Sequence, residues 1–307
     1  KGINYYPQET PWDLFWSEYD STVIANDLAV IRDLELNSVR IFIPFAQFGG
    51  AKVLPEMLEH LTDFLDQADE NNVQVIITLF DFRTDYQLLL WPQSDRHLET
   101  LLTTFAEHPA ILAWDIKNEP DLDYVSQGKM VVDAWLAHTL QQARHYAPNQ
   151  LFTIGWSSPE TAVSLATQVD FVSFHYYAPA AELSERYERL RTIVPDKPLL
   201  LGEFGLPTWN SFFFPNGHTQ PEQAVYYADV LDFIEQTDSV GYFAWTLYDF
   251  DDVPNGVAGR WPWQIGPQKK MGILQSNGEP KLAVEALVDN GTADIMRPPT
   301  YARFLKP

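Results

Sequence analysis

The chain has 307 residues, of which 46% are hydrophobic, and its 42 acidic residues against 20 basic residues give a formal net charge of −22. This charge disfavours binding to nucleic acid or anionic membranes, but it does not hinder a neutral ligand. The absence of cysteine excludes disulfides, thiolate metal ligands and a cysteine nucleophile. No apolar run approaches the roughly 20 residues of a membrane span, and no linker-like segment divides the chain. We therefore expect a single domain over residues 1–307, with an extended tail at about 290–307.

Eight short apolar segments recur along the chain and predict eight β-strands. Most of them are continuous apolar runs without clean alternation, which is typical of strands that are covered on both faces. The predicted strands are residues 2–6, 38–43, 73–80, 111–117, 151–155, 170–177, 197–204 and 240–245.

Segments with helical periodicity separate these strands. In residues 22–36, for example, apolar residues at positions 24, 28, 31 and 34 fall on one helix face. Strands that alternate with helices predict a parallel sheet, and eight such units predict an α/β fold with a closed (β/α)₈ TIM barrel. A doubly wound open sheet is the alternative, but the chain has no GxGxxG or GxxxxGK[ST] sequence for phosphate binding. The other predicted helices are about 55–70, 95–107, 127–146, 159–167, 182–193, 221–236 and 280–289.

Two glutamates stand at the ends of predicted strands. Glu119, in DIKNEP (115–120), follows the fourth strand, and Glu203, in LLLGEFG (199–205), ends the seventh. In a barrel the strand ends share one face, where active sites are built. Two facing carboxylates suit glycoside hydrolysis, because one protonates the leaving oxygen while the other attacks the anomeric carbon or activates water. The simpler interpretation is that each glutamate is an ordinary solvated or helix-capping carboxylate.

Four short sequences at predicted strand ends carry a family resemblance. They are NEP (118–120), HYY (175–177), GEFG (202–205) and AWTLYDF (244–250). In this order they resemble clan A glycoside hydrolases, and most closely family 5, the group of cellulases and β-mannanases. The resemblance extends over most of the chain, from GINYYP near the start to MGIL (271–274).

The resemblance implies a division of labour between the two glutamates. Glu119 would be the general acid/base, with a pKa raised by an apolar setting so that it stays protonated near neutral pH. Glu203 would be the nucleophile and must stay ionised. Arg40 falls where the family has an arginine, and with Tyr177 it would hold Glu203 by charge and hydrogen bonding. A structural ion pair for Arg40 and simple packing for Tyr177 are the alternatives.

Three further residues acquire expected roles from the same resemblance. Asn118 would bind the sugar 2-hydroxyl, a contact that strengthens in the transition state. His175 would line the pocket and order Glu119 or the sugar, and Trp245 would form the platform under the sugar at the cleavage point. A turn or cap role for Asn118, and burial in the core for His175 and Trp245, are the alternatives.

The loops depart from the family pattern. Residues 79–86 read LFDFRTDY and lack the histidines that many cellulases of the family carry there, so we expect Asp81 or Arg83 to contact sugar instead. The segments 83–93, 207–218 and 249–268 are long and are predicted to form the cleft walls. Further sugar platforms are predicted at Trp91, Trp209, Trp261 and Trp263, with local loop packing as the alternative.

Other chemistries fit the sequence less well. The histidines form no HxH or HExxH ligand set, so we expect no metal at the catalytic centre. A calcium ion at 249–256 is the weaker interpretation of an acidic loop. Lys117 as a Schiff base would leave the rest of the site unexplained, and GWSSP (155–159) is not a GxSxG elbow.

These inferences together predict a retaining β-glycoside hydrolase without a cofactor. The expected substrate is a neutral β-1,4-linked polysaccharide or oligosaccharide, with β-glucan ranked before mannan and endo or exo action left open. A β-mannanase or an exo-acting β-glycosidase of the same family is the alternative, and a sugar-binding barrel without catalysis is the alternative from another class. We expect a secreted or periplasmic monomer that does not insert into membranes.

Overall fold

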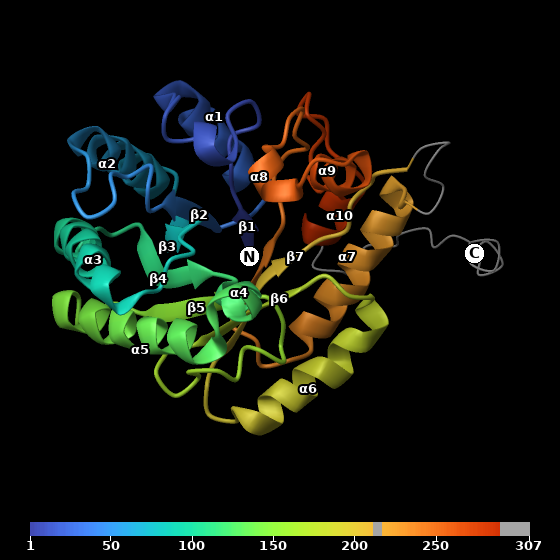
Figure 1. Ribbon diagram of the computed structural model, residues 1–307. Helices are drawn as coiled ribbons and strands as arrows, with labels where there is room; N and C mark the ends of the chain where they lie inside the picture. Colours follow the sequence, from blue (N-terminus) through green and yellow to red (C-terminus); the bar gives the residue numbers. More distant parts are fainter. Residues whose placement is uncertain (211–216, 289–307) are drawn as a thin grey trace.

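The computed structural model describes residues 1–210 and 217–288, and its eight strands close into one parallel barrel (Figure 1). Each strand pairs with the next along the chain, and β8 pairs with β1 to close the ring. The predicted α/β class and (β/α)₈ barrel are therefore confirmed, whereas the tail expected at about 290–307 lies outside the described residues. The strands are β1 Gly2–Asn4, β2 Ser38–Pro44, β3 Gln74–Asp81, β4 Ile111–Asn118, β5 Phe152–Trp156, β6 Val172–Tyr176, β7 Leu199–Phe204 and β8 Gly241–Ala244.

Helices surround the barrel in the ring that Figure 1 shows from one end. None of the helices in the described ranges combines the length and apolar character that a membrane crossing requires. The α-helices are α1 Ser21–Asp33, α2 Pro55–Glu70, α3 Trp91–Phe105, α4 Tyr124–Gln127, α5 Lys129–Tyr146, α6 Leu183–Ile193, α7 Gln220–Glu235, α8 Asn255–Ala258, α9 Pro262–Gln268 and α10 Ala283–Val288. Short 3₁₀ helices are η1 Trp12–Leu14, η2 Leu88–Leu90, η3 Pro120–Asp123 and η4 Ala180–Glu182.

The predicted helix at 159–167 is wrong. Those residues form successive turns between β5 and β6, although Ala162 and Ala166 are buried. The nine residues of this segment include two threonines, one serine and one valine, which favour helices less than straight-chain residues do. Leu165 has a φ of 55°, in the left-handed region, and interrupts any helical turn.

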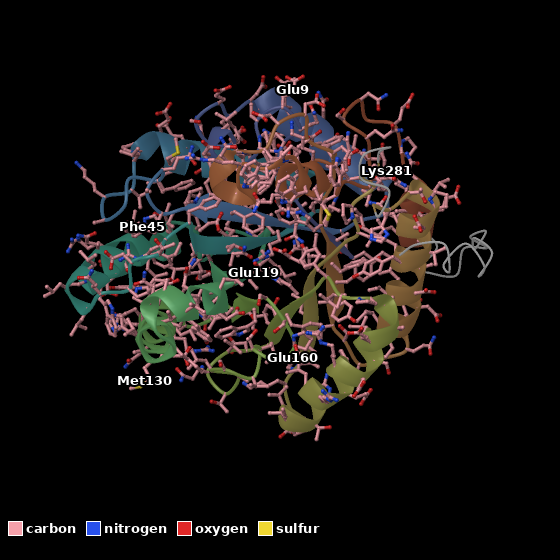
Figure 2. All side chains as sticks on the ribbon, turned by 45° about the vertical axis from the view of Figure 1, so that its right-hand side comes forward. Glu9, Phe45, Glu119, Met130, Glu160 and Lys281 are labelled. Carbon is pink, nitrogen blue, oxygen red and sulfur yellow. The ribbon has the colours of Figure 1, made fainter. Side chains whose placement is uncertain are left out.

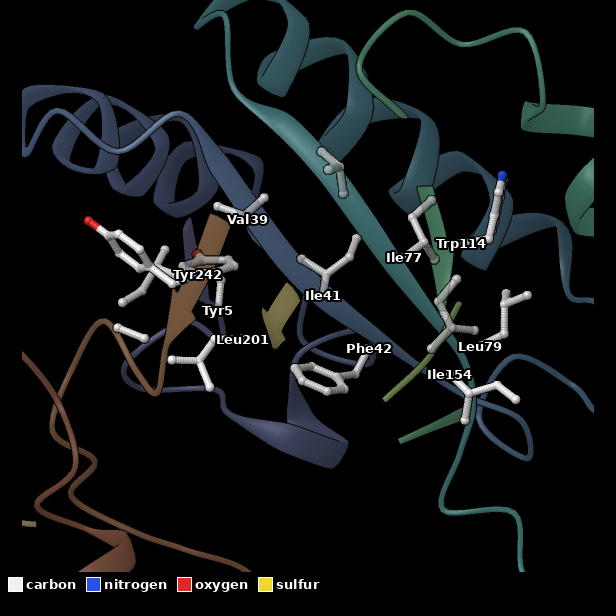
Figure 3. Packing of buried hydrophobic residues seen from close by; sticks show 14 of the residues in the cluster. Tyr5, Val39, Ile41, Phe42, Ile77, Leu79, Trp114, Ile154, Leu201 and Tyr242 are labelled. Carbon is white, nitrogen blue, oxygen red and sulfur yellow. The ribbon is translucent and has the colours of Figure 1, made fainter. Parts of the chain in front are cut away.

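The outer faces of the strands make the main core against the helices. Val39, Ile41, Ile77 and Leu79 alternate along β2 and β3 and are fully buried. Figure 3 shows them together with Trp114 of β4. Because strand side chains alternate between faces, the residues between them point into the barrel. The continuous apolar runs of the sequence result from this burial on both faces.

The barrel interior is layered, with an apolar floor below a polar layer. Ile76 and Ala113 belong to a separate small apolar cluster with Phe171, Leu200 and Phe243. Two residues further along β3 and β4, on the same face, come Thr78 and Asp115, which hydrogen-bond to each other at 3.0 Å. The change from apolar to polar toward the strand ends places buried charge directly beneath the rim where Glu119 and Glu203 stand.

Candidate active site

The structure brings Glu119 and Glu203 together at the C-terminal rim of the barrel. Glu203 lies near the end of β7, and Glu119 follows the last residue of β4. A carboxylate oxygen of each, together with a ring nitrogen of His175, lie within 4.8 Å of one another. Glu119 appears near the middle of the molecule in Figure 2. The two carboxylates are therefore close enough to act on the same bond.

Arg40 of β2 organises the layer below these carboxylates. Its guanidinium forms ion pairs with Asp115 and with Glu203, each at 2.6 Å. It also donates to Asn4 at 2.9 Å and to Asn118 at 2.8 Å. Arg40 is only 1% exposed, so these partners offset the cost of burying its charge. Burial lowers the pKa of Arg40, but the charges of Asp115 and Glu203 outweigh burial and raise it above its ordinary value.

Asp115 and Asn4 are partners that the sequence analysis missed. Asp115 accepts from Arg40, from Thr78 at 3.0 Å and from the backbone nitrogen of Gly155 at 2.8 Å. The available signal was a charged residue inside the apolar strand ILAWDIK, since a buried carboxylate requires a partner. Arg40 therefore forms both contacts: the structural ion pair, which is with Asp115, and the expected contact with Glu203.

Gly155 of β5 makes room for this network. A Cβ at position 155 would lie 2.8 Å from Arg40 Nη2 and 2.9 Å from Asp115 Oδ2. Both atoms belong to the buried ion pair and cannot move without breaking it. A side chain at this position would therefore displace the pair, which explains the need for glycine on strand β5.

Glu203 is held from two sides. Its Oε1 accepts from Arg40 at 2.6 Å, and its Oε2 accepts from the Tyr177 hydroxyl at 2.7 Å. Burial and the charges of Glu203 and Glu119 raise the pKa of Tyr177 well above its ordinary value, so the hydroxyl stays a donor. Arg40 and Tyr177 therefore occupy the positions expected of groups that fix and charge-stabilise this carboxylate.

Glu119 has an unusual backbone conformation and a close imidazole partner. Its φ of 43° and ψ of 51° lie in the left-handed region, which is uncommon for residues other than glycine. Its Oε1 lies 2.8 Å from Nδ1 of the fully buried His175. Among the residues that the structure describes, the buried Nε2 of His175 has no hydrogen-bond partner, and its Nδ1 also lies 3.5 Å from Oε2 of Glu203.

The direction of the Glu119 pKa differs from the expectation. Burial raises the pKa of Glu119, but the hydrogen bond and charge of His175, with smaller contributions from Arg40 and Lys117, outweigh burial and lower it. The sequence analysis considered the apolar setting alone and expected a raised pKa, which is wrong for the ligand-free site. The contact with His175 therefore favours the ionised form of Glu119 in the free enzyme.

Asn118 hydrogen-bonds to the buried network through its side-chain oxygen alone. Its Oδ1 accepts from Arg40 Nη2. Within the described part of the chain, its Nδ2 makes no hydrogen bond, and Asn118 lines the pocket. The expected contact with a sugar hydroxyl therefore has a free donor at a fixed position.

A pocket of about 500 Å³ opens above the two glutamates. Trp245 lines it, half-buried, and its ring packs edge-on against Tyr6 and Phe42 with centroid distances of 6.3 and 5.9 Å. The peptide bond between Trp245 and Thr246 is cis. The mixture of aromatic faces and a few fixed polar groups is typical of small-molecule pockets. Other lining residues are Trp12, Asp81, Phe82, Asn118, Leu122, Tyr177, Leu206, Pro207, Val257, Gln268 and Met271.

A family model described as "Cellulase (glycosyl hydrolase family 5)" matches residues 3–251. The chain belongs to glycosyl hydrolase family 5. The resemblance read from the short sequences at the strand ends is thereby confirmed, and the protein is a glycoside hydrolase. Clan A enzymes, to which this family belongs, typically retain the configuration at the anomeric carbon.

Solved structures of other glycoside hydrolases share the fold. An exo-beta-1,4-mannosidase from Opitutaceae bacterium strain TAV5 superposes with a TM-score of 0.78 at 19% identity, over 96% of this chain and 59% of that one. A GH5_18 protein from Streptomyces cattleya in complex with Manβ1-4GlcNAc gives 0.74 at 17% identity, over 97% of this chain and 82% of that one. A GH2 beta-galacturonidase from Eisenbergiella tayi gives 0.71 at 18% identity, over 94% and 50%. A sequence search of curated proteins gives no match.

Asp81 lies in the pocket of this family 5 hydrolase, whereas Arg83 does not. Burial raises the pKa of Asp81 to about 6, although the charges of Lys117 and Arg40 act in the opposite direction. Arg83 turns away, with its guanidinium 4.3 Å from the Phe45 ring centroid. Of the two residues expected to contact sugar after the third strand, the structure brings only Asp81 to the pocket.

The four loop tryptophans do not line the pocket of the hydrolase. Trp91 donates to the backbone oxygen of Tyr86 at 2.9 Å and stacks on His138 of α5 at 4.6 Å, outside the barrel. The Trp209 indole packs so close to Gly266 of α9 that a Cβ there would lie 2.3 Å away. Trp261 and Trp263 stack on each other at 5.1 Å and are 58% and 53% exposed. Local packing thus explains Trp91, at the start of α3, and Trp209, and the paired Trp261 and Trp263 stand outside the pocket wall.

A metal site is a poor fit to the residues at the centre. Glu119, His175 and Glu203 are close enough to share an ion. However, Glu203 already accepts from Arg40 and Tyr177, and Glu119 is bonded to His175. A cation here would have to approach the buried guanidinium of Arg40. The acidic loop at 249–256 fits calcium no better, because Asp249 is paired with Lys281 at 2.6 Å.

Proposed function

We propose that this family 5 hydrolase is a retaining β-glycosidase in which Glu203 is the nucleophile and Glu119 is the general acid/base. The observation that carries the proposal is that one carboxylate oxygen of Glu119 and one of Glu203 lie within 4.8 Å of each other. Retaining enzymes place their carboxyl groups about 5–5.5 Å apart, whereas inverting enzymes need about 6.5–9.5 Å to admit a water molecule. The separation supports direct attack by one carboxylate.

In the first step, Glu203 attacks the anomeric carbon while the bond to the leaving oxygen breaks. Arg40 and the Tyr177 hydroxyl donate to the two oxygens of Glu203 and fix their orientation. The Nδ2 of Asn118 donates to the sugar 2-hydroxyl, and Trp245 packs beneath the ring. These contacts give Glu203 an oriented approach to one face of the sugar.

Glu119 supplies a proton in the first step and removes one from water in the second. Its pKa is lowered in the free enzyme by His175, which suits the base role. The acid role requires the carboxyl proton, and sugar binding favours it because displaced water leaves Glu119 in a less polar environment. His175, bonded at 2.8 Å, fixes the orientation of the Glu119 carboxyl group for both steps.

The shape of the pocket supports a short substrate. Its volume is about 500 Å³, and Trp91, Trp209, Trp261 and Trp263 do not extend its walls as a row of platforms. We therefore favour exo action on β-1,4-linked oligosaccharides or simple β-glycosides over cleavage inside a polymer. β-Mannosides are the preferred substrates, since two structurally similar proteins are named for mannose-containing ligands or activity. β-Glucosides, ranked first from the sequence, are the second candidate because the family model is described as Cellulase.

A panel of substrates tests this proposal. Mannobiose, cellobiose and xylobiose would be incubated with the enzyme beside mannan, β-glucan and xylan, and product lengths would be measured by chromatography. We expect monosaccharide release, fastest from mannobiose, and proton NMR should detect the β-anomer as the first product. Initial release of the α-anomer would overturn the retaining mechanism, and a ladder of long products from a polymer would overturn exo action.

A further inference from the structure

Six exposed apolar side chains lie on the two loops that reach the pocket beside Glu119, and two of them line it. Single exposed apolar residues are ordinary, but contiguous groups mark binding surfaces. Their exposed fractions range from 50% for Phe82 to 99% for Val125. The cluster, here named the apolar rim, consists of Phe82, Leu88, Leu89, Leu122, Val125 and Met130.

The apolar rim comes from two loops that are tied together. Phe82, Leu88 and Leu89 lie between β3 and α3, and the other three lie between β4 and the first turn of α5. The Tyr86 hydroxyl of the first loop donates to the carboxylate of Asp123 in the second. This bond holds the two groups of apolar side chains on one surface.

The apolar rim is continuous with the pocket. Phe82 and Leu122 are themselves part of the pocket wall, whereas Val125 and Met130 extend outward from it. Figure 2 shows this direction, with Glu119 near the centre and Met130 at the outer edge of the molecule. A ligand bound at Glu119 therefore meets Phe82 and Leu122 first, and the other four side chains lie further along the same two loops.

Charged residues beside the apolar rim are engaged with other groups. Asp121 accepts from the backbone nitrogen of Ser157 at 3.1 Å. Asp123 is bonded to Tyr86 and lies 3.8 Å from Lys117. Lys129 donates to Ser164 at 2.9 Å and forms an ion pair with Asp133 of α5. These charges already have partners within the protein, which favours a neutral ligand over a charged one.

The position of the apolar rim relative to Glu119 identifies the part of the substrate that it faces. An acid must reach the leaving oxygen, so the leaving group lies on the Glu119 side of the scissile bond. Leu122 is three residues beyond Glu119, and its backbone nitrogen donates to the Glu119 carbonyl at 3.1 Å. The other side of the pocket, near Glu203, is lined by Leu206 and Pro207.

We propose that the apolar rim binds an alkyl chain carried by the leaving group, so that the enzyme hydrolyses alkyl β-glycosides or the sugar–lipid bond of a neutral glycolipid. This inference rests on the proposed function, because it assigns the leaving-group side from Glu119. Glu203 forms a bond to the anomeric carbon as the bond to the alkyl oxygen breaks, and the alcohol leaves with the proton of Glu119. Water then releases the sugar. The net charge of −22 favours a neutral ligand over an anionic lipid surface.

The test is a series of n-alkyl β-glycosides from ethyl to octyl, used below their micelle concentrations and built on the sugar that the substrate panel identifies. The leaving alcohols have nearly equal acidity, so a change in rate reports binding of the chain. If each methylene is about half buried on the apolar rim, kcat/KM should rise about twofold per methylene. From butyl to octyl the expected rise is roughly tenfold or more.

Substitutions locate the effect. Leu89→Ser and Val125→Ser, both on fully solvated positions, should flatten the dependence of kcat/KM on chain length. Ile193→Ser is the matched control, because Ile193 is 62% exposed at the far end of α6 and should keep the wild-type dependence. Thermal unfolding of each variant would verify that it is folded.

Three results would overturn the inference, and they are distinct from failure of the proposed function. A flat dependence in the wild-type enzyme, with short glycosides still hydrolysed, removes the alkyl site and leaves the proposed function standing. Equal dependence in all variants places the chain elsewhere. A wild-type dimer that Leu89→Ser dissociates assigns the surface to a second copy. Absence of hydrolysis for every glycoside, aryl glycosides included, defeats the proposed function itself.

Discussion

Replacing Arg40 by methionine tests the buried network beneath the active site. Methionine is unbranched and has similar reach, so the substitution removes charge and hydrogen bonds with a modest change of volume. Arg40 is 1% exposed and contacts both Asp115 and Glu203 at 2.6 Å. The variant therefore leaves two carboxylates in a buried site without their cation.

The structure allows an estimate of the cost. Breaking a buried ion pair by removing one partner destabilises a protein by about 3–5 kcal/mol, because the other charge is left uncompensated. We expect Arg40→Met to lower the free energy of unfolding by about this amount. The matched control is Arg189→Met, which breaks a pair with Glu185 whose side chains are 68% and 69% exposed. Exposed pairs within a helix contribute about 0.3–0.5 kcal/mol.

Urea unfolding at pH 7, followed by the fluorescence of the 10 tryptophans, would measure both variants. Adding Asp115→Asn to Arg40→Met should restore about 1 kcal/mol or more, because it removes one of the stranded charges. A loss below about 1 kcal/mol for Arg40→Met would refute the reasoning. So would a further loss when Asp115→Asn is added to the variant.

The other predictions concern the acid role of Glu119, the ionisation of Asp81 and the metal hypothesis. Glu119→Ala should slow glycosides with poor leaving groups by about 10²–10⁴-fold and activated aryl glycosides far less, and equal slowing in a comparison of kcat/KM would argue against an acid role. The pKa of Asp81 is raised to about 6, so its carboxylate loses charge as the pH falls through that value. The KM of the wild type should then rise from pH 7 to pH 5, while Asp81→Asn shows little change. The raised pKa also means that Asp81 ionises less readily in the folded protein than in the unfolded chain, so its ionisation lowers the free energy of unfolding of the wild type as the pH rises toward 6. Asp81→Asn lacks this loss, so its free energy of unfolding relative to wild type should increase from pH 5 to pH 7. A constant difference would contradict this. Activity should persist in EDTA, and its loss on chelation would restore the metal hypothesis.

The barrel and its paired glutamates could be predicted because both follow from the burial of the strands on both faces and from their parallel direction. Continuous apolar runs indicate strands that are covered on both faces, and parallel strands bring their ends to one rim. Glu119 and Glu203 needed only that rule to be placed together. The prediction of a helix at 159–167 rested on apolar spacing alone. That spacing did not reveal that Leu165 adopts a left-handed conformation, which ends any helical turn.

The partners of Arg40 and the direction of the Glu119 pKa required coordinates. Asp115 lies 75 residues from Arg40 along the chain, and only barrel closure places it under the guanidinium. Glu119 was predicted from its apolar surroundings, whereas the hydrogen bond from His175 at 2.8 Å decides the direction. No sequence periodicity shows in which direction an aromatic side chain such as that of Trp91 points. The sequence therefore could not distinguish a sugar platform from local packing.

The most direct test of the central claim is to trap the covalent intermediate on Glu203. The enzyme would be incubated with 2,4-dinitrophenyl 2-deoxy-2-fluoro-β-mannoside and with the corresponding glucoside, whose fluorine slows release of the sugar from the enzyme. Peptide mass spectrometry should locate one added fluorosugar on Glu203, with loss of activity in proportion to labelling. Labelling of Glu119 or another residue, or turnover of an active enzyme to the inverted product, would contradict the account.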